Sequence, residues 1–385
     1  MGEYLPVLRE RVRAPRFNSL FLFVTSRCNS LCRTCFYFDQ LNSPDDLSFD
    51  EIRRISETAP RFRKLWISGG EPFLREGLAE IIGVFARNNG IRNVNLPTNG
   101  LLGERIFREV GEIRRLAPET SIDLNFSLDG LANTHDVIRG VPNNFGRTVE
   151  TLKEAAERWR GDKRLRVNVA TVITRTNYRE ILQLGLKLAE EARVDGHYFE
   201  VVRGETPDAG MKGLSESEVR ELHSRLMPLH RMYARRLFAH LAAPMRALAS
   251  MYYLGNIRLH FDLHEKCLSR PSKWPMQCTA GQTSLVIDHN GAFRACELRP
   301  RVGRMQDFGL DTGAVLRSAA LGDEVARIPE ANCWCTHSCF IQDSSKFSAR
   351  VQLFEIPWAW LRQRKDGLQN APLEEIERFR ALELA

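Results

Sequence analysis

The segment CNSLCRTC, residues 28–35, follows closely on the apolar run SLFLFVT, residues 19–25. A short apolar run of this kind is typical of a buried β-strand. Cys28, Cys32 and Cys35 therefore fall in the loop after the first predicted strand. Loops at the carboxyl ends of strands are where strand–helix proteins collect their functional sites. We expect a thiol-ligated site at this edge of a sheet.

Short apolar strands alternate with amphipathic helical segments through the first half of the chain. The predicted strands cover 19–25, 64–70, 93–100, 122–130, 164–174 and 197–204, and the predicted helices lie near 49–59, 77–88, 102–115, 145–159 and 177–191. Repeated strand–helix units indicate an α/β fold with a parallel sheet and right-handed crossovers. Six units suit either a doubly wound sheet or an incomplete barrel, and periodicity does not separate the two.

After residue 204 the pattern changes to long helices. Ser215 and Glu218 form a capping-box pattern, Pro228 is predicted to kink or end that helix, and another helix follows to about 251. We divide the chain into an amino-terminal extension, a strand–helix domain, a helical insertion that could form a lid, a cysteine-rich domain and an amphipathic tail, at residues 1–18, 19–204, 205–262, 263–345 and 346–385.

The composition is that of a globular protein, with 43% hydrophobic and 27% charged residues and a formal charge of +7. The basic residues are spread along the chain, so we expect no nucleic-acid partner. The sequence has no apolar segment long enough to span a bilayer and no signal-peptide core, which predicts a cytoplasmic protein. The nine cysteines are clumped at 28–35 and 267–339. In a reducing compartment such clumping favours metal binding over disulfides.

The first cysteine group allows three interpretations. Cys32 and Cys35 could form a redox pair, or the three thiols could bind zinc with a fourth ligand, or they could hold a [4Fe–4S] cluster with one open iron. The spacing Cys-x3-Cys-x2-Cys resembles the signature of the radical S-adenosylmethionine (radical SAM) enzymes. The resemblance implies a partial (β/α)6 barrel and S-adenosylmethionine bound to the open iron. It also implies an external one-electron reductant, flavodoxin or ferredoxin, and a 5′-deoxyadenosyl radical that abstracts hydrogen, a chemistry we group with the oxidoreductases.

Later motifs resemble the cosubstrate-binding segments of the same family. They are ISGGEP at 67–72, LPTNG at 96–100, SLDG at 127–130 and HDVIRG at 135–140. The resemblance implies that ISGGEP binds the methionine amino group and that the serine and arginine of the last two motifs bind its carboxylate. The cofactor-binding residues implied are Gly69, Gly70, Glu71, Thr98, Asn99, Ser127, Asp129, Arg139 and Thr171.

One position departs from the family pattern. The aromatic residue that usually precedes the third cysteine is replaced by Thr34, and Phe36 follows Cys35. We expect either that Phe36 stacks on the adenine instead or that the backbone holds the adenine.

The second cysteine group frames CTAGQTSLVIDHNGAFRAC, residues 278–296, and continues in CWCTHSC, residues 333–339. The pattern resembles the SPASM and twitch auxiliary-cluster domains, and five thiols imply one further [4Fe–4S] cluster rather than two. A zinc ribbon is the alternative. The implied ligands are Cys278, Cys296 and Cys339 with Cys335 or, less favoured, Cys333, while Cys267 has no place in the pattern.

The function predicted first is radical SAM chemistry on a small-molecule or lipid substrate, with the auxiliary cluster transferring electrons or binding substrate. One alternative is a peptide or protein maturase with the same mechanism, disfavoured because the first strand begins by residue 19. Another is a non-catalytic iron–sulfur or zinc redox sensor or RNA-binding protein. The aromatic and basic segment RVQLFEIPWAWLRQRK, residues 350–365, predicts either a peripheral membrane contact or packing over the cysteine-rich domain.

Overall fold

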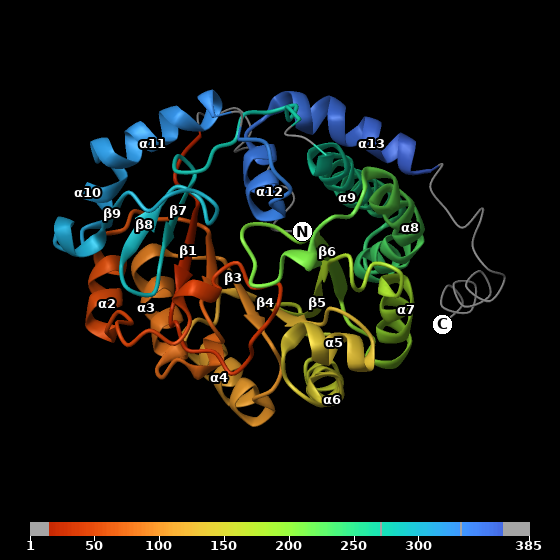
Figure 1. Ribbon diagram of the computed structural model, residues 1–385, viewed down its shortest axis with the longest axis horizontal. Coiled ribbons are helices and arrows are strands. Elements are labelled where there is room, and N and C mark those ends of the chain that lie inside the picture. Colours follow the sequence, from red (N-terminus) through yellow and green to blue (C-terminus); the bar gives the residue numbers. More distant parts are fainter. Residues whose placement is uncertain (1–14, 270–271, 332, 365–385) are drawn as a thin grey trace.

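The computed structural model describes residues 15–269, 272–331 and 333–364 (Figure 1). Its centre is one nine-stranded sheet with the strand order β6-β5-β4-β3-β2-β1-β7-β8-β9. The strands are β1 (Ser19–Phe23), β2 (Lys64–Ser68), β3 (Asn93–Thr98), β4 (Ser121–Ser127), β5 (Leu165–Ile173), β6 (Gly196–Val201), β7 (Ser284–Ile287), β8 (Ala292–Arg294) and β9 (Gly303–Arg304).

The strand order decides between the two predicted architectures. Strands β1 to β6 are parallel and lie side by side in chain order. A doubly wound sheet reverses its order at a switch point. Here each right-handed crossover adds the next strand on the same side, so the connecting helices all lie on one face. The predicted six-stranded partial barrel is confirmed.

Helices cover the outer side of these strands (Figure 1). They are α2 (Phe49–Thr58), α3 (Leu78–Asn89), α4 (Gly103–Leu116), α5 (Ala132–Arg139), α6 (Asn144–Arg158) and α7 (Ile181–Glu191). The predicted helices appear close to their expected limits. Ser48 and Glu51 begin α2 with a reciprocal capping box. Helix α5, which ends at Arg139, was not predicted from the sequence.

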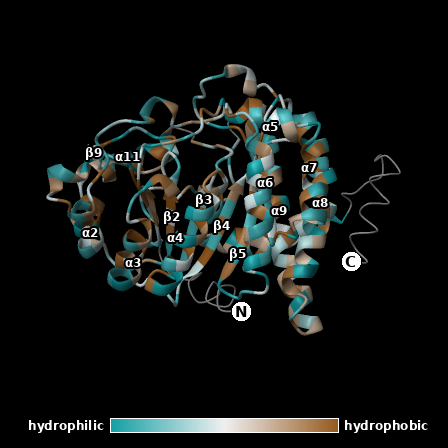
Figure 2. Cartoon of the chain, turned by 90° about the horizontal axis from the view of Figure 1, so that it is seen from below, coloured by the Kyte–Doolittle hydropathy of each residue, from teal (hydrophilic) through white to brown (hydrophobic). Residues whose placement is uncertain are grey.

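The barrel strands have two different faces. In β2, Leu65 is fully buried and does not line the central cavity, whereas Lys64, Trp66 and Ser68 line it, together with part of the buried Ile67. This alternation follows from the two-residue period of a strand. Figure 2 shows hydrophobic strand segments enclosed by helices that carry both hydrophilic and hydrophobic residues. The apolar core therefore lies between sheet and helices, and the inner face of the sheet is free to bind ligands.

Two long helices, α8 (Glu216–Phe238) and α9 (Ala243–Ser269), follow the barrel. Pro228 lies inside α8, so the prediction that it ends the helix is wrong. Proline removes one backbone hydrogen bond. The buried neighbours Met227 and Leu229 retain the helix by packing. Helix α9 also continues beyond the expected end near 251, past the boundary drawn at residue 262.

The cysteine-rich region continues the barrel sheet. Strand β7 pairs in parallel with β1, and β7 and β8 form an antiparallel hairpin. Tyr37, just after the first cysteine group, is hydrogen-bonded through its hydroxyl to His289 Nδ1 of the hairpin turn at 2.6 Å. The helices of this region are α10 (Thr312–Leu316), α11 (Ala319–Glu330) and α12 (Ser338–Lys346). Residues from the two cysteine-containing regions thus share one sheet.

The aromatic segment near the carboxyl end forms the π-helix η5 (Val351–Glu355) and helix α13 (Ile356–Gln363). Ile356 is fully buried, and the backbone there approaches Gly255 of α9. The opposite side is exposed at four apolar residues, Leu353, Phe354, Trp358 and Leu361. No helix in the described ranges is long and apolar enough to cross a membrane. Contact with a lipid surface stays a prediction, and Lys365 with the rest of the predicted tail lies outside the described residues, as does most of the predicted extension at 1–18.

Candidate active site

Residues 28–35, here called the cysteine loop, connect β1 to the short helix η1 (Phe38–Gln40). Cys28, Cys32 and Cys35 all line the central cavity. The backbone N–H of Leu31 donates to the carbonyl of Arg139 at 3.1 Å, and Gly140 is required there because a Cβ would lie 2.7 Å from the carbonyl oxygen of Leu31. The end of α5 therefore fixes the middle of the cysteine loop.

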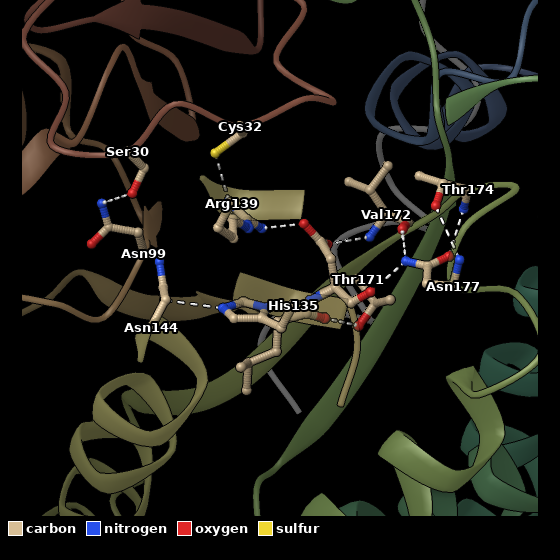
Figure 3. Close-up of polar contacts among 12 residues, drawn as sticks. Ser30, Cys32, Asn99, His135, Arg139, Asn144, Thr171, Val172, Thr174 and Asn177 are labelled. Carbon is tan, nitrogen blue, oxygen red and sulfur yellow. Dashed lines mark hydrogen bonds and ion pairs between the residues drawn. The ribbon is translucent and has the colours of Figure 1, made fainter. Parts of the chain in front are cut away.

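A second contact fixes the beginning of the cysteine loop. The side-chain amide of Asn99, just after β3, donates to Asn29 Oδ1 at 2.6 Å. It also donates to Ser30 Oγ at 3.2 Å (Figure 3). Asn99 is also a cavity residue. Its amide group is thus committed to positioning the thiols, a role that the sequence motif alone did not reveal.

The thiols of the cysteine loop suit metal ligation better than redox pairing. All are free, and burial raises the pKa of Cys28 to about 12 and that of Cys35 to about 11. A buried thiolate needs a cation or a metal to stabilise it. Within the described ranges no three His, Cys, Asp or Glu side chains are close enough to share one metal ion. In a cubane cluster each thiolate binds its own iron, so three thiols around one cavity fit a [4Fe–4S] cluster.

The ISGGEP motif follows β2 and places Glu71 in the same cavity. Gly69 and Gly70 are needed because a Cβ at either position would clash with the backbone carbonyl of Thr25 or Arg27. These glycines therefore allow the loop after β2 to pack closely against the segment that follows β1. The N–H of Gly70 donates to Thr25 O and that of Glu71 to Arg27 O, both at 2.8 Å.

Glu71 is a buried carboxylate, only 2% exposed. It accepts hydrogen bonds from the backbone N–H of Asn99 at 2.7 Å, from Thr98 Oγ1 at 3.0 Å and from the backbone N–H of Phe73 at 3.2 Å. Burial nevertheless raises its pKa to about 7. A cationic ligand would reverse that effect. The site therefore fits the amino group of a bound amino acid, as the resemblance implies.

Arg139, at the end of α5, connects the cysteine loop to β4. Its guanidinium forms an ion pair with the fully buried Asp129 at 2.7 Å and donates to Cys32 Sγ at 3.6 Å (Figure 3). The Nε of Arg139 has no hydrogen-bond partner in the described structure. Arg139 and Ser127 both line the cavity, so a carboxylate ligand can approach either. Asp129 does not line the cavity, and its ion pair instead positions Arg139.

Two further predicted residues have different environments. Phe36 lines the cavity, and the guanidinium of Arg203 lies 5.3 Å from its ring centroid. Thr171 is buried in β5, where its hydroxyl donates to the carbonyl of Leu128 at 2.5 Å and contacts His197 Nε2 at 2.7 Å. Thr171 is not among the residues that line the cavity, so the structure does not bring it to the other predicted ligands.

The cavity has a volume of about 610 Å³, within the range of roughly 300–1,000 Å³ typical of ligand pockets. It extends from the cysteine loop along the inner face of the sheet to helices α8, α9 and α12. Tyr252, Tyr253 and His260, from the helical insertion that was expected to form a possible lid, line it. Many further polar and aromatic lining residues had no site role predicted from sequence: Lys64, Trp66, Asn93, Asp123, Asn125, Arg166, Tyr198, Glu200, Arg203, His230, Glu297, Gln342 and Lys346.

The five thiols of the second cysteine group separate into two environments. Cys278, Cys296, Cys333 and Cys335 act electrostatically on one another. Cys339 lines the central cavity, which none of those four does. Burial raises its pKa, and the charged side chains that act on it include Glu200 and Arg203.

Two neighbours of this group have other partners. His337 Nε2 is hydrogen-bonded to Glu297, so this nitrogen is committed to a carboxylate. Cys267, on α9, donates from its thiol to the carbonyl of Ser272 at 3.4 Å. Cys267 nevertheless lies near Cys335, since the two thiols interact electrostatically.

Comparisons with known proteins agree with this geometry. Residues 22–187 match the family model described as the Radical SAM superfamily. A GTP 3′,8-cyclase of Edwardsiella ictaluri is 30% identical over 253 residues, which cover 64% of this chain and 73% of the relative. The sporulation killing factor maturation protein SkfB of Bacillus subtilis is 28% identical over 47% of this chain and 39% of its own length. Against the first curated relatives, GTP 3′,8-cyclases of Helicobacter pylori, the chain spans about 60% of their length.

Solved structures share the fold at low sequence identity. Streptococcus suis SuiB bound to S-adenosylmethionine has a TM-score of 0.53 at 16% identity, covering 84% of this chain and 71% of SuiB. His-tagged anSMEcpe with bound AdoMet has a TM-score of 0.53 at 15% identity, covering 95% of this chain and 96% of that one. With the barrel order, the cysteine loop and the family match, the chain belongs to the radical SAM superfamily.

Proposed function

We propose that this protein reductively cleaves S-adenosylmethionine at a [4Fe–4S] cluster bound by the three thiols of the cysteine loop. One observation carries the proposal. A single cavity is lined by those thiols, by the buried carboxylate of Glu71, and by Ser127 and Arg139. A carboxylate beside a guanidinium and a hydroxyl matches the amino and carboxylate groups of a methionine moiety.

When bound, the cluster would supply one electron that breaks the C5′–S bond of the cosubstrate, which would leave methionine and a 5′-deoxyadenosyl radical able to take hydrogen from substrate. The protein's own residues hold the reactants. Glu71, oriented by Thr98 and Asn99, accepts the ammonium group of the cosubstrate. Arg139, held by its ion pair with Asp129, donates to the carboxylate, and Ser127 adds a hydroxyl donor.

The electron has to come from outside the chain, because thiols and carboxylates do not supply it. A flavodoxin or a ferredoxin is the proposed partner. This role rests on the family's chemistry rather than on a surface of this protein.

We further propose an auxiliary [4Fe–4S] cluster bound by Cys278, Cys296, Cys333 and Cys335. Their mutual electrostatic influence supports this set. It differs from the ligand set favoured from sequence, since the charges that act on Cys339 are those of Glu200, Arg203, Glu297 and Lys64. A cluster at this position lies behind the cavity wall and can exchange an electron with a substrate radical.

A peptide is the substrate class that the comparisons favour. SkfB is named as a maturation protein, SuiB has been solved with the precursor peptide SuiA, and anSMEcpe with the Cp18Cys peptide. These relatives support the maturase alternative better than the small-molecule or lipid substrate predicted first.

A nucleotide-like small molecule is the second candidate. Most of the curated relatives described above are GTP 3′,8-cyclases, and one of them aligns over 253 residues, beyond the barrel alone. The two candidates share the same radical step and differ in what the far end of the cavity has to bind.

The test of the proposed function is the formation of 5′-deoxyadenosine. Anaerobically reconstituted protein, reduced with dithionite and given S-adenosylmethionine, should release 5′-deoxyadenosine and methionine. The control is the same protein with Cys28, Cys32 and Cys35 replaced by alanine, which should release neither.

A further inference from the structure

The far end of the central cavity lies at the amino-terminal ends of the barrel strands. Lys64 of β2, Asn93 of β3, Asp123 of β4 and Arg166 of β5 all line it. Because a strand rises about 3.3 Å per residue, Lys64 lies about 13 Å below Ser68 at the carboxyl end of β2. This end is therefore well separated from the cysteine loop and from Glu71.

The two carboxylates near this end already have cationic partners. Asp123 accepts from Arg166 Nε at 2.7 Å and from Asn93 Nδ2 at 2.9 Å. Asp343 of α12 pairs with Lys346 at 3.0 Å. Each of these carboxylates is thus paired with a cation other than Lys64.

The Lys64 ammonium has no carboxylate within ion-pair distance in the described part of the chain. It lies over the ring of Trp66, 3.6 Å from the centroid. The charged and titratable groups that act on it from neighbouring elements are Asp123, Asp343, Lys346 and Cys339, and burial lowers its pKa to about 8. At neutral pH Lys64 is still mostly protonated, so the cavity contains an ammonium that lacks an anion.

Trp66 supplies a second unmatched donor. Its indole Nε1 is buried and has no acceptor among the described residues, and the residue is only 9% exposed. Trp66 is two residues from Lys64 on the same face of β2, and both line the cavity. Two donors from one strand face, next to matched ion pairs, form a concave site for a negative group.

We propose that Lys64 and Trp66 form a subsite for an anionic group of the substrate, a carboxylate or a phosphate. The inference rests on the proposed function only in taking this cavity as the substrate cavity. An anion bound here accepts from the ammonium and the indole N–H, while Arg166 and Lys346 add favourable potential. The substrate then spans the cavity, with its anion at the far end and its reacting carbon nearer the cysteine loop.

The test measures anion binding without turnover. Inorganic pyrophosphate and glutarate are titrated separately into the reconstituted, unreduced protein by calorimetry. We expect the better-bound anion to lose about 10- to 100-fold in affinity in Lys64→Met, since a charged hydrogen bond contributes about 1.5–3 kcal/mol. Trp66→Phe keeps an aromatic ring beneath the ammonium but removes the N–H donor together with the pyrrole ring, so affinity should fall a few-fold. Lys187→Met removes a surface lysine that pairs with Glu191 and should bind as the unmodified protein does.

The outcomes separate the two sources of the anion and the two proposals. Preference for pyrophosphate supports the subsite with a phosphorylated substrate, and preference for glutarate supports it with a carboxylate such as an acidic peptide residue. Equal affinity in Lys64→Met and in the unmodified protein overturns the subsite, as does no binding of either anion at millimolar concentration. If Lys64→Met does not fold, unchanged affinity in Trp66→Phe overturns the role of the indole. Formation of 5′-deoxyadenosine by the unmodified protein is measured separately, so either proposal can fail alone.

Discussion

The carboxylate of Glu71 accepts the backbone N–H of Asn99 at 2.7 Å, and the side chain of Asn99 holds the cysteine loop. Asn99, the residue that follows β3, therefore orients two parts of the site. They are Glu71, the proposed ligand of the methionine amino group, and the cysteine loop with its proposed cluster ligands. The geometry of the two halves of the site is coupled through Asn99.

The first prediction concerns pH. The raised pKa of Glu71, about 7 instead of 4.5, means that the free folded protein holds this proton more tightly than the unfolded chain does. This carboxyl group therefore contributes stability at low pH, and that contribution is lost as the pH rises from 4.5 to 7. Binding of an ammonium requires the ionised form. Affinity for S-adenosylmethionine should fall up to about tenfold per pH unit below 7.

Equilibrium dialysis between pH 5.5 and 7.5 measures this dependence. Glu71→Gln is the matched variant, which should bind more weakly and show no pH slope in this range. A flat profile in the unmodified protein would place the ammonium elsewhere.

The second prediction concerns the ion pair of Arg139 and Asp129. Arg139→Ala leaves Asp129 buried without its cation, so it should destabilise the protein by about 3–5 kcal/mol. Adding Asp129→Asn should recover much of that loss without restoring affinity for S-adenosylmethionine. The surface variant Arg158→Ala, which loses a pair with Glu154, should cost at most about 1 kcal/mol. Urea unfolding under anaerobic conditions measures the free energies, and full stability in Arg139→Ala alone would contradict the account.

The third prediction compares two glycines. Gly70→Ala forces the ISGGEP motif away from the carbonyl of Arg27, so we expect a loss of about 1–3 kcal/mol and weaker binding of S-adenosylmethionine. Gly111 lies in α4, and a Cβ there meets nothing within 4 Å. Gly111→Ala should stabilise the protein by up to about 1 kcal/mol. Thermal unfolding measures the stability of both variants, and equilibrium dialysis measures their affinity for S-adenosylmethionine. If Gly70→Ala were as stable as Gly111→Ala and bound S-adenosylmethionine as tightly, the tight loop contact would be refuted.

The fourth prediction concerns the second cysteine group. Because the charges that act on Cys339 are those of Glu200, Arg203, Glu297 and Lys64, Cys339→Ser should keep the iron of both clusters. Cys296→Ser should lose about half of the iron. Chemical iron analysis with Mössbauer spectroscopy counts the clusters. If both variants lost the same amount of iron, Cys339 would be a ligand of the auxiliary cluster.

The sequence was enough to predict the features that depend on local pattern. The six barrel strands are short apolar runs, so their positions along the chain and the sequence motifs near their carboxyl ends could be predicted. The order of the strands in the sheet could not, because periodicity left a doubly wound sheet open as well. Helix α5 was missed because ANTHDVIR has few apolar residues and reads as a loop. Pro228 does not end its helix as predicted, because the packing of the buried residues around it outweighs the low helix propensity of proline.

The remaining features depend on contacts between distant residues. The parallel pairing of β7 with β1 joins segments more than 260 residues apart, as Ser19 and Ser284 show. The rotation of α12 about its axis decides whether Cys339 faces the other auxiliary thiols or the cavity. The spacing of Cys333, Cys335 and Cys339 in the sequence does not determine that rotation. Lys64 and Trp66 read as ordinary strand residues until the inner face of the barrel is known to be a cavity.

The formation of 5′-deoxyadenosine tests the central claim most directly. Reconstituted protein reduced in the presence of S-adenosylmethionine should form 5′-deoxyadenosine, and the variant with Cys28, Cys32 and Cys35 replaced by alanine should form none. An unmodified protein that contains its iron, is reduced, and leaves S-adenosylmethionine intact would contradict the account, as would undiminished cleavage by the triple variant.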